Sequence, residues 1–145
     1  MAAIVKALED EGLDYALCGG VALAVHGIPR ATKDIDILVP PSAVERVRAV
    51  ARSCGFKFDA LPMTFRSSGI SVRRFAKLIE GQPLMLDVLV ADSVLQEVWE
   101  RRERVEWQEG RLSVVSVDGL VTMKLAAARP QDLADVERLR ELQDG

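Results

Sequence analysis

The feature that most constrains this chain is a pair of glycines followed, after a spacer of thirteen residues, by two aspartates in an apolar segment. Gly19 and Gly20 come after the apolar run 15–18 and before a run of small aliphatic residues, which predicts a turn from a strand into a helix. Backbone N–H groups at the start of a helix attract anions, and glycine lets a phosphate approach the main chain closely. The glycine pair therefore indicates either a phosphate-binding turn or simply a tight turn.

Asp34 and Asp36 alternate with isoleucines in the segment 34–39, a pattern typical of a β-strand. The two carboxylates are expected on one face of that strand, with their Cα atoms about 6.6 Å apart. Carboxylates at this separation can converge on two divalent cations, whereas the commonest use of such a pair is on a solvent-facing strand. Because both acids interrupt an aliphatic segment and would repel each other without a cation, we favour metal binding.

Asp87 is the one charged residue in the aliphatic segment 83–90, which is also predicted to be a strand. A lone carboxylate in an apolar strand is costly unless it is paired, hydrogen-bonded or bound to a metal. If this strand lies beside the strand 34–39, then Asp34, Asp36 and Asp87 meet at one edge of the sheet. The alternative is a structural carboxylate satisfied by a backbone group or by an arginine.

Lys124 is the single charged residue in the apolar segment 119–128, which is predicted to be helical. It shares a stripe of the helix with three apolar residues, Leu120, Met123 and Ala127. A lysine on a buried stripe must either extend its ammonium group to solvent or contact an anion, and both remain open. Asp132 and Asp135 follow Pro130, where a second helix is expected, and either can complement that helix's N-terminus.

Taken in order, the glycine pair, the Asp-x-Asp strand and the isolated Asp87 resemble the nucleotidyltransferase superfamily, which has the polymerase-beta-like fold. The segment 121–135 is similar to the "Lys-Leu-x-Ala … Arg-x-x-Asp-Leu-x-Asp" segment of a small branch that includes abortive-infection-type nucleotidyltransferase toxins. The motifs extend from about Cys18 to Asp135, which is most of the chain.

The resemblance implies an α+β fold, a nucleotidyltransferase-like mixed β-sheet with helices packed mainly on one side, and a single domain over residues 1–145. It implies transfer of a nucleoside monophosphate from an NTP to a hydroxyl acceptor, with Mg²⁺ or Mn²⁺ as cofactor. The acceptor class is open among RNA such as tRNA, a protein and a small molecule. A cognate antitoxin or a second copy of the chain is the expected protein partner. The alternative is a nucleotide-binding or toxin–antitoxin subunit that has the fold but little or no catalysis.

By the same resemblance, three acids are assigned to catalysis and metal binding: Asp34, Asp36 and Asp87. Four residues are assigned to nucleotide binding: Gly19, Gly20, Lys124 and Arg30. Two further residues, Arg129 and Asp132, are secondary candidates. Gly20 stands where many members carry serine, so only backbone donors are expected there. The chain stops soon after Asp135, which leaves no separate acceptor-binding domain in the expected architecture.

Composition agrees with a compact domain, because 49% of the residues are hydrophobic. With 19 basic and 22 acidic residues the net charge is −3, which argues against an overall nucleic-acid-binding surface. A local basic cluster remains, formed by Arg66, Arg73, Arg74 and Lys77. Cys18 and Cys54 are interpreted as free thiols of a reducing compartment, which predicts a cytoplasmic protein. His26 is the only histidine, and no apolar run approaches the length of a membrane span, so no membrane partner is expected.

Periodicity predicts helices over residues 2–11, 20–26, 42–53, 92–102, 119–128 and 131–142. It predicts strands over residues 15–18, 34–39, 56–59, 70–78, 84–90, 105–107 and 112–117. Turns at 80–83 and 109–110 are expected to close two hairpins. Ser42 and Glu45 have the spacing of a capping box at the start of the third helix.

Overall fold

The computed structural model describes residues 1–30, 34–65, 68–107 and 110–144. Its α-helices are α1 (Ala2–Asp10), α2 (Gly19–Val25), α3 (Val44–Ser53), α4 (Gln96–Glu100), α5 (Val117–Ala127) and α6 (Pro130–Asp144). Short 3₁₀ turns, Pro41–Ala43 and Ser93–Leu95, lead into α3 and α4. Within these ranges no helix is long and apolar enough to cross a membrane.

The strands belong to one mixed sheet, which has eight strands over the described residues. They are β1 (Ala16–Cys18), β2 (Ile35–Val39), β3 (Phe58–Asp59), β4 (Met63–Thr64), β5 (Ser71–Ile79), β6 (Gln82–Val90), β7 (Glu103–Trp107) and β8 (Gly110–Val114). The order across the sheet is β3-β5-β6-β2-β1-β8-β7, and β4 also pairs with β5. The β2–β6 and β1–β8 pairs are parallel and the others are antiparallel. The expected α+β class and mixed sheet are confirmed.

The central strands β2 and β6 bury one face completely and leave the other face partly open. Along β6 the alternate residues Leu86 and Val88 are fully buried, whereas Asp87 between them is partly exposed. In β2 the side chains of Ile35, Ile37 and Val39 are buried in the same way. Because successive strand residues point to opposite faces, Asp36 and Asp87 share the face that is not sealed.

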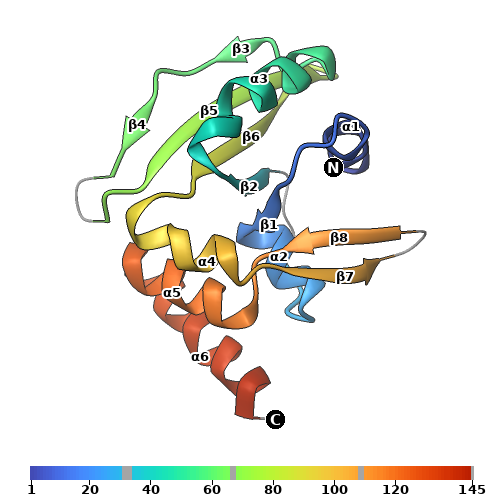
Figure 1. Cartoon of the computed structure of the whole chain (residues 1–145). Helices are drawn as coiled ribbons and strands as arrows, with labels where there is room; N and C mark the ends of the chain where they lie inside the picture. The colour runs from blue at the N-terminus through green and yellow to red at the C-terminus, as the bar shows by residue number, and fades with distance from the viewer. Residues whose placement is uncertain (31–33, 66–67, 108–109, 145) are drawn as a thin grey trace.

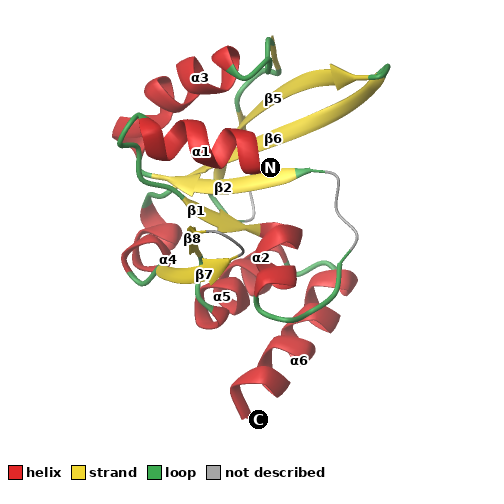
Figure 2. Ribbon diagram, turned by 90° about the vertical axis from the view of Figure 1, so that its right-hand side faces the viewer, coloured by secondary structure: helices red, strands yellow, loops and turns green. Residues whose placement is uncertain are grey.

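The helices form two groups at different parts of the sheet (Figure 1). Helices α1 and α3 contact each other and lie on the side of β2 away from α2, α5 and α6 (Figure 2). Helices α4, α5 and α6 pack in sequence, α4 on α5 and α5 on α6. The short helix α2 contacts both β1 and β2, the strands on either side of it in the sequence. Helix α5 faces the open side of the central strands, because its residues Leu120 and Lys124 line the same cavity as Asp36 and Asp87.

The boundaries of α5 have clear local causes. Ser116 lies at the N-cap in an extended conformation, and its hydroxyl accepts a hydrogen bond from the Gly119 N–H at 3.0 Å. At the other end Ala128 adopts φ +53°, and its N–H donates to the Lys124 carbonyl at 2.8 Å. This left-handed residue ends α5 two residues before Pro130 begins α6. The sharp connection brings the first turn of α6 against the end of α5.

Several local predictions were wrong. The capping box of Ser42 and Glu45 does not form: a 3₁₀ turn precedes α3, and no side chain caps either element. The residues 115–117, predicted to extend the last strand, instead lead into α5, because Ser116 caps that helix. The helix expected over 92–102 is divided into a 3₁₀ turn and α4. The strand β4 was missed, since two residues are too few for periodicity to detect. Arg66 and Glu109, part of the predicted basic cluster and hairpin turn, lie outside the described residues.

Replacement of Ser116 with alanine tests the N-cap of α5. Ser116→Ala removes the acceptor for the buried Gly119 N–H, and we expect the free energy of unfolding to fall by about 1 kcal/mol. Urea denaturation followed by circular dichroism measures this change. Ser42→Ala is the matched control, because Ser42 makes no cap. Equal losses for the two variants would show that the Ser116 cap does not stabilise α5.

Candidate active site

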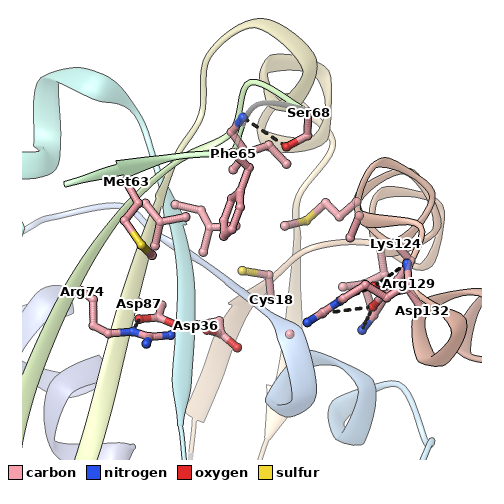
Figure 3. Close-up of a pocket in the computed structure, with 17 residues that line it drawn as sticks. Cys18, Asp36, Met63, Phe65, Ser68, Arg74, Asp87, Lys124, Arg129 and Asp132 are labelled. Carbon is pink, nitrogen blue, oxygen red and sulfur yellow. Dashed lines mark hydrogen bonds and ion pairs between the residues drawn. The ribbon is translucent and has the colours of Figure 1, made fainter. Parts of the chain in front are cut away.

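Four polar or reactive residues form a row across four adjacent strands. In the strand register Cys18 pairs with Asp36, Asp36 pairs with Asp87, and Asp87 pairs with Arg74. Because paired residues of adjacent strands point to the same face, their side chains lie together above the partly open face of the sheet. Figure 3 shows Arg74, Asp87 and Asp36 side by side at the floor of a cavity. The parallel pairing of β2 with β6 is what places the two carboxylates next to each other.

Gly19 brings the first turn of α2 against the carboxylate of Asp36. It directly follows Cys18 and adopts φ +65°, a conformation that favours glycine. A Cβ atom built at Gly19 would lie 2.1 Å from Oδ2 of Asp36. Any side chain at this position would therefore displace Asp36 or the helix. The glycine of the strand-to-helix turn is required for the helix start and the Asp36 carboxylate to lie this close.

The electrostatics of the row are unfavourable for Asp36 and favourable for Asp87. Burial and the negative charges of Asp87 and Asp34 raise the pKa of Asp36 from 3.8 to about 6. Asp87 receives two hydrogen bonds from the Arg74 guanidinium, Nε to Oδ1 at 2.7 Å and Nη2 to Oδ2 at 2.9 Å. Sequence analysis left open that an arginine satisfies Asp87, and in the structure that arginine is Arg74. The site thus carries one carboxylate with an arginine partner and one whose charge its surroundings disfavour.

Cys18, at the β1 end of the row, is fully buried. Burial, together with Asp36 and Asp87, raises the pKa of its thiol well above the ordinary value. It is therefore a neutral thiol in the cavity wall. Cys18 and Cys54 are both free, as predicted.

A second charged cluster joins the end of α5 to the start of α6. The Lys124 ammonium lies 3.2 Å from Oδ1 of Asp132 and 3.1 Å from Oδ2 of Asp135. Arg129 donates to Asp132 through its side-chain Nε at 2.8 Å and through its backbone N–H at 3.2 Å. Arg30, in the segment after α2, is paired with Asp135. Lys124 therefore contacts an anion, and in this structure the anion is a pair of carboxylates of the chain itself.

The two acids of this cluster are almost inaccessible to solvent: Asp132 is 1% exposed and Asp135 is 3% exposed. Burial disfavours the charge of Asp132, but hydrogen bonds from Arg129 and Lys124 outweigh this and hold its pKa below the ordinary value. Buried carboxylates of this kind are stable only with their cations in place. The cluster therefore fixes Lys124 and the α5–α6 corner in one arrangement.

Both clusters line one cavity of about 360 Å³ between the sheet and α5 (Figure 3). Its polar lining is formed by Gly19, Asp36, Ser68, Arg74, Asp87, Lys124, Arg129 and Asp132. Its remaining lining is formed by Cys18, Met63, Phe65, Ile70, Val72, Leu89, Leu120, Met123 and Ala127. A cavity of this volume is within the range of small-molecule sites. The predicted α5 stripe that contains Lys124 faces this cavity.

The structure thus brings together most of the predicted site residues. Gly19, Asp36, Asp87 and Lys124 line the cavity, as do the secondary candidates Arg129 and Asp132. The other three predicted residues, Asp34, Gly20 and Arg30, do not line it. Asp34 is exposed and precedes β2, and its charge acts on Asp36. Arg30 reaches the site only through its ion pair with Asp135.

The sequence analysis did not place Arg74, Met63 or Phe65 in the site. Composition alone assigns Arg74 to a local cluster of basic residues. The turn between β5 and β6 spans only two residues, since Ile79 pairs with Gln82, and counting back along the hairpin places Arg74 opposite Asp87. The predicted turn of four residues, 80–83, gives a different register and does not place Arg74 opposite Asp87. Met63 and Phe65 lie in and just after a strand too short to be predicted.

The family model "Nucleotidyl transferase AbiEii toxin, Type IV TA system" matches residues 1–145. The chain belongs to this family. A comparison with curated protein sequences finds no match.

Solved structures share the fold. The candidate nucleotidyltransferase TM1012 of Thermotoga maritima has a TM-score of 0.62 at 16% identity, over 97% of this chain and 88% of that one. The protein ANT(2'')-Ia, in complex with adenylyl-2''-tobramycin, has a TM-score of 0.59 at 17% identity, over 99% of this chain and 87% of that one. JHP933 of Helicobacter pylori has a TM-score of 0.52 at 21% identity, over 97% of this chain and 63% of that one. The expected nucleotidyltransferase superfamily and its AbiEii-like branch are confirmed.

The chemistry of the Asp36–Asp87 pair fits a divalent cation in part. The charge of Asp36 is disfavoured and would be stabilised by a cation, and carboxylate oxygens are the ligands that Mg²⁺ prefers. Over the described ranges, however, no three histidine, cysteine or acidic side chains are grouped closely enough to hold a metal ion. The predicted three-acid site is thus present as an adjacent pair, with Asp34 two residues away along the chain. The metal role of these residues stays a prediction.

Replacement of Gly19 tests its close approach to Asp36. Gly19→Ala combines an unfavourable φ with a direct clash, whereas Gly12→Ala, at φ +68°, meets no atom within 4 Å. We expect Gly12→Ala to cost about 1 kcal/mol and Gly19→Ala to cost about 1 kcal/mol more than that. Urea denaturation of both variants measures the difference. Equal costs would show that Asp36 can move away from the helix start without penalty.

The raised pKa of Asp36 predicts a pH-dependent effect of Asp36→Asn. With a folded-state pKa of about 6 against 3.8, the wild-type fold keeps a proton that the unfolded chain releases. This contribution to stability is complete below about pH 4 and is lost as the pH rises through about 6. In EDTA, Asp36→Asn should therefore be more stable than wild type by up to about 3 kcal/mol at neutral pH, and the gain should vanish at about pH 4. Denaturation at a series of pH values tests this, and a less stable variant at neutral pH would contradict it.

Proposed function

We propose that this chain transfers a nucleoside monophosphate from an NTP to a hydroxyl acceptor, with release of pyrophosphate, in a reaction that requires Mg²⁺ or Mn²⁺. One observation carries the proposal: the carboxylates of Asp36 and Asp87 lie side by side where α2 begins. Membership of the AbiEii family supports nucleotidyl transfer in general. The geometry supports the finer assignment of roles that follows.

Asp36 and Asp87, together with Asp34, would hold the cations. Divalent cations bound there would stabilise charge on the attacking and leaving oxygens of an in-line displacement. The open face of the sheet leaves the carboxylates of Asp36 and Asp87 accessible from the cavity. Asp87 would also be placed to accept the proton of the acceptor hydroxyl. A bound cation would lower the pKa of Asp36 from about 6 towards the ordinary value of a carboxyl group.

The phosphates would lie between the start of α2 and the end of α5. The first backbone N–H groups of α2, at Gly19 and Gly20, have no carbonyl acceptor within the helix and can donate to phosphate oxygens. Lys124 and Arg129 line the opposite wall of the same cavity. Asp132 and Asp135 hold Lys124 in place through ion pairs, and Arg30 forms a further ion pair with Asp135. In this proposal Arg30 contributes through the ion-pair cluster.

The family and one structural relative give support for the acceptor class and the partner. The structure of ANT(2'')-Ia, which shares the fold, is of a complex with adenylyl-2''-tobramycin, so a small molecule is one acceptor class to test. The family name supports a toxin role and a cognate antitoxin as partner. RNA, including tRNA, and protein remain the acceptor classes to test first for a toxin.

The alternative is a chain that binds nucleotide without transferring it. The observation that favours this alternative is the bidentate Arg74–Asp87 pair, because Arg74 occupies the carboxylate oxygens that a cation would need. Transfer requires that this pair open or that a cation share Asp87 with Arg74.

Labelled NTPs decide between the two. With Mg²⁺ and candidate tRNA or protein acceptors, α-phosphate label should enter the acceptor and γ-phosphate label should appear in pyrophosphate. Asp36→Asn and Asp87→Asn should each reduce transfer by at least about a hundredfold, since each removes charge at the reacting phosphate. Asp92→Asn is the control, because Asp92 is an exposed acid just after β6. Binding of NTP without transfer to any acceptor would favour the alternative.

A further inference from the structure

The cavity has an unusual wall made of apolar side chains that are exposed. Met63 is 41% exposed and Phe65 is 50% exposed, although both line the cavity. They are two residues apart on one extended segment, so both point to the same side. Figure 3 shows the Phe65 ring directed into the cavity from above, on the side opposite the row of Asp36, Asp87 and Arg74. An exposed aromatic ring in a concave site indicates a ligand surface.

The position of Phe65 is fixed by the backbone. Its N–H donates to the Ile70 carbonyl at 2.9 Å, and its carbonyl accepts from the Gly69 N–H at 2.7 Å. Just before it, Met63 pairs with Val72 of β5 in the sheet. The ring is thus presented by a segment whose backbone groups are already satisfied. Little backbone freedom at Phe65 therefore remains to be lost when a ligand covers the ring.

The cavity is divided into an apolar part and a charged part. The apolar part combines Met63 and Phe65 with Ile70, Val72, Leu120 and Met123. The charged part contains Asp36, Asp87, Arg74, Lys124 and Arg129. A ligand that fits both parts has a flat apolar group joined to a strongly charged group. A nucleoside triphosphate has this character, because its base has a π-face and its phosphates carry the charge.

We propose that Phe65 is the stacking platform for the nucleobase, with Met63 beside it, and that this surface sets how the nucleotide is bound. The inference rests on the proposed function, since it assigns the base half of the same NTP site. Stacking on an aromatic ring tolerates any base. The platform therefore holds all four NTPs by one surface.

Substitution of Phe65 separates base binding from phosphate binding. By isothermal titration with Mg²⁺, Phe65→Ala should weaken binding of each NTP by about 5- to 100-fold and leave binding of inorganic triphosphate unchanged. Phe65→Trp should retain NTP affinity. Phe58→Ala is the matched control, because Phe58 is also exposed, at 60%, but lies on β3 outside the cavity lining. It should change neither affinity.

Fluorescence gives a second measurement that does not depend on loss of binding. The indole of Phe65→Trp should be quenched by NTPs beyond the change seen in wild type, and not by triphosphate, whereas Phe58→Trp should show no such quenching. Unchanged NTP affinity in Phe65→Ala, or equal losses for NTP and triphosphate, would overturn the platform while leaving the proposed function intact. A wild-type chain that binds no NTP would overturn both.

Discussion

The parallel pairing of β2 with β6 places Asp36 directly beside Asp87 and so concentrates negative charge on one face of the sheet. The residues around the pair either balance this charge or leave room for it. Arg74 satisfies Asp87 from the neighbouring strand, and Gly19 leaves room for the Asp36 carboxylate against the start of α2. The remaining imbalance appears as the raised pKa of Asp36. A fold that needed only stability would replace such a pair with apolar residues, because buried like charges are costly. In the proposed function, a bound cation would relieve this repulsion.

The α5–α6 corner also contains buried negative charge, but there cations of the chain itself balance it. Asp132 and Asp135 are more deeply buried than Asp36, yet Lys124, Arg129 and Arg30 compensate their charges. This cluster fixes the corner that forms one wall of the cavity. One wall is thus electrostatically balanced and rigid, whereas the floor is unbalanced. A charged substrate bound between them would interact with preorganised groups on one side and relieve repulsion on the other.

The short segment 63–65 contributes two exposed apolar side chains to the cavity wall. Met63 and Phe65 lie beside a two-residue strand at the edge of the sheet, and their exposure makes little sense as core packing. Opposite them is the apolar stripe of α5. The site therefore joins a charged floor on the central strands to an apolar wall that includes Met63 and Phe65. In the proposed site the floor would bind the metal and phosphates, and the apolar wall would bind the base.

The sequence by itself determined the local elements of the site: the strand-to-helix turn at Gly19, the alternation around Asp36, and Lys124 on an apolar helical stripe. These follow from backbone conformation and periodicity, which are local properties. The α+β class and the mixed sheet followed from the family that these motifs resemble. Only the tertiary structure decided the partners. Arg74 on Asp87 depends on a two-residue hairpin register, and Lys124 on Asp132 and Asp135 depends on the left-handed turn at Ala128. Phe65 entered the site because β4 pairs with β5. Such contacts arise from the packing of distant segments, and a one-residue change of register would have placed different side chains in the cavity.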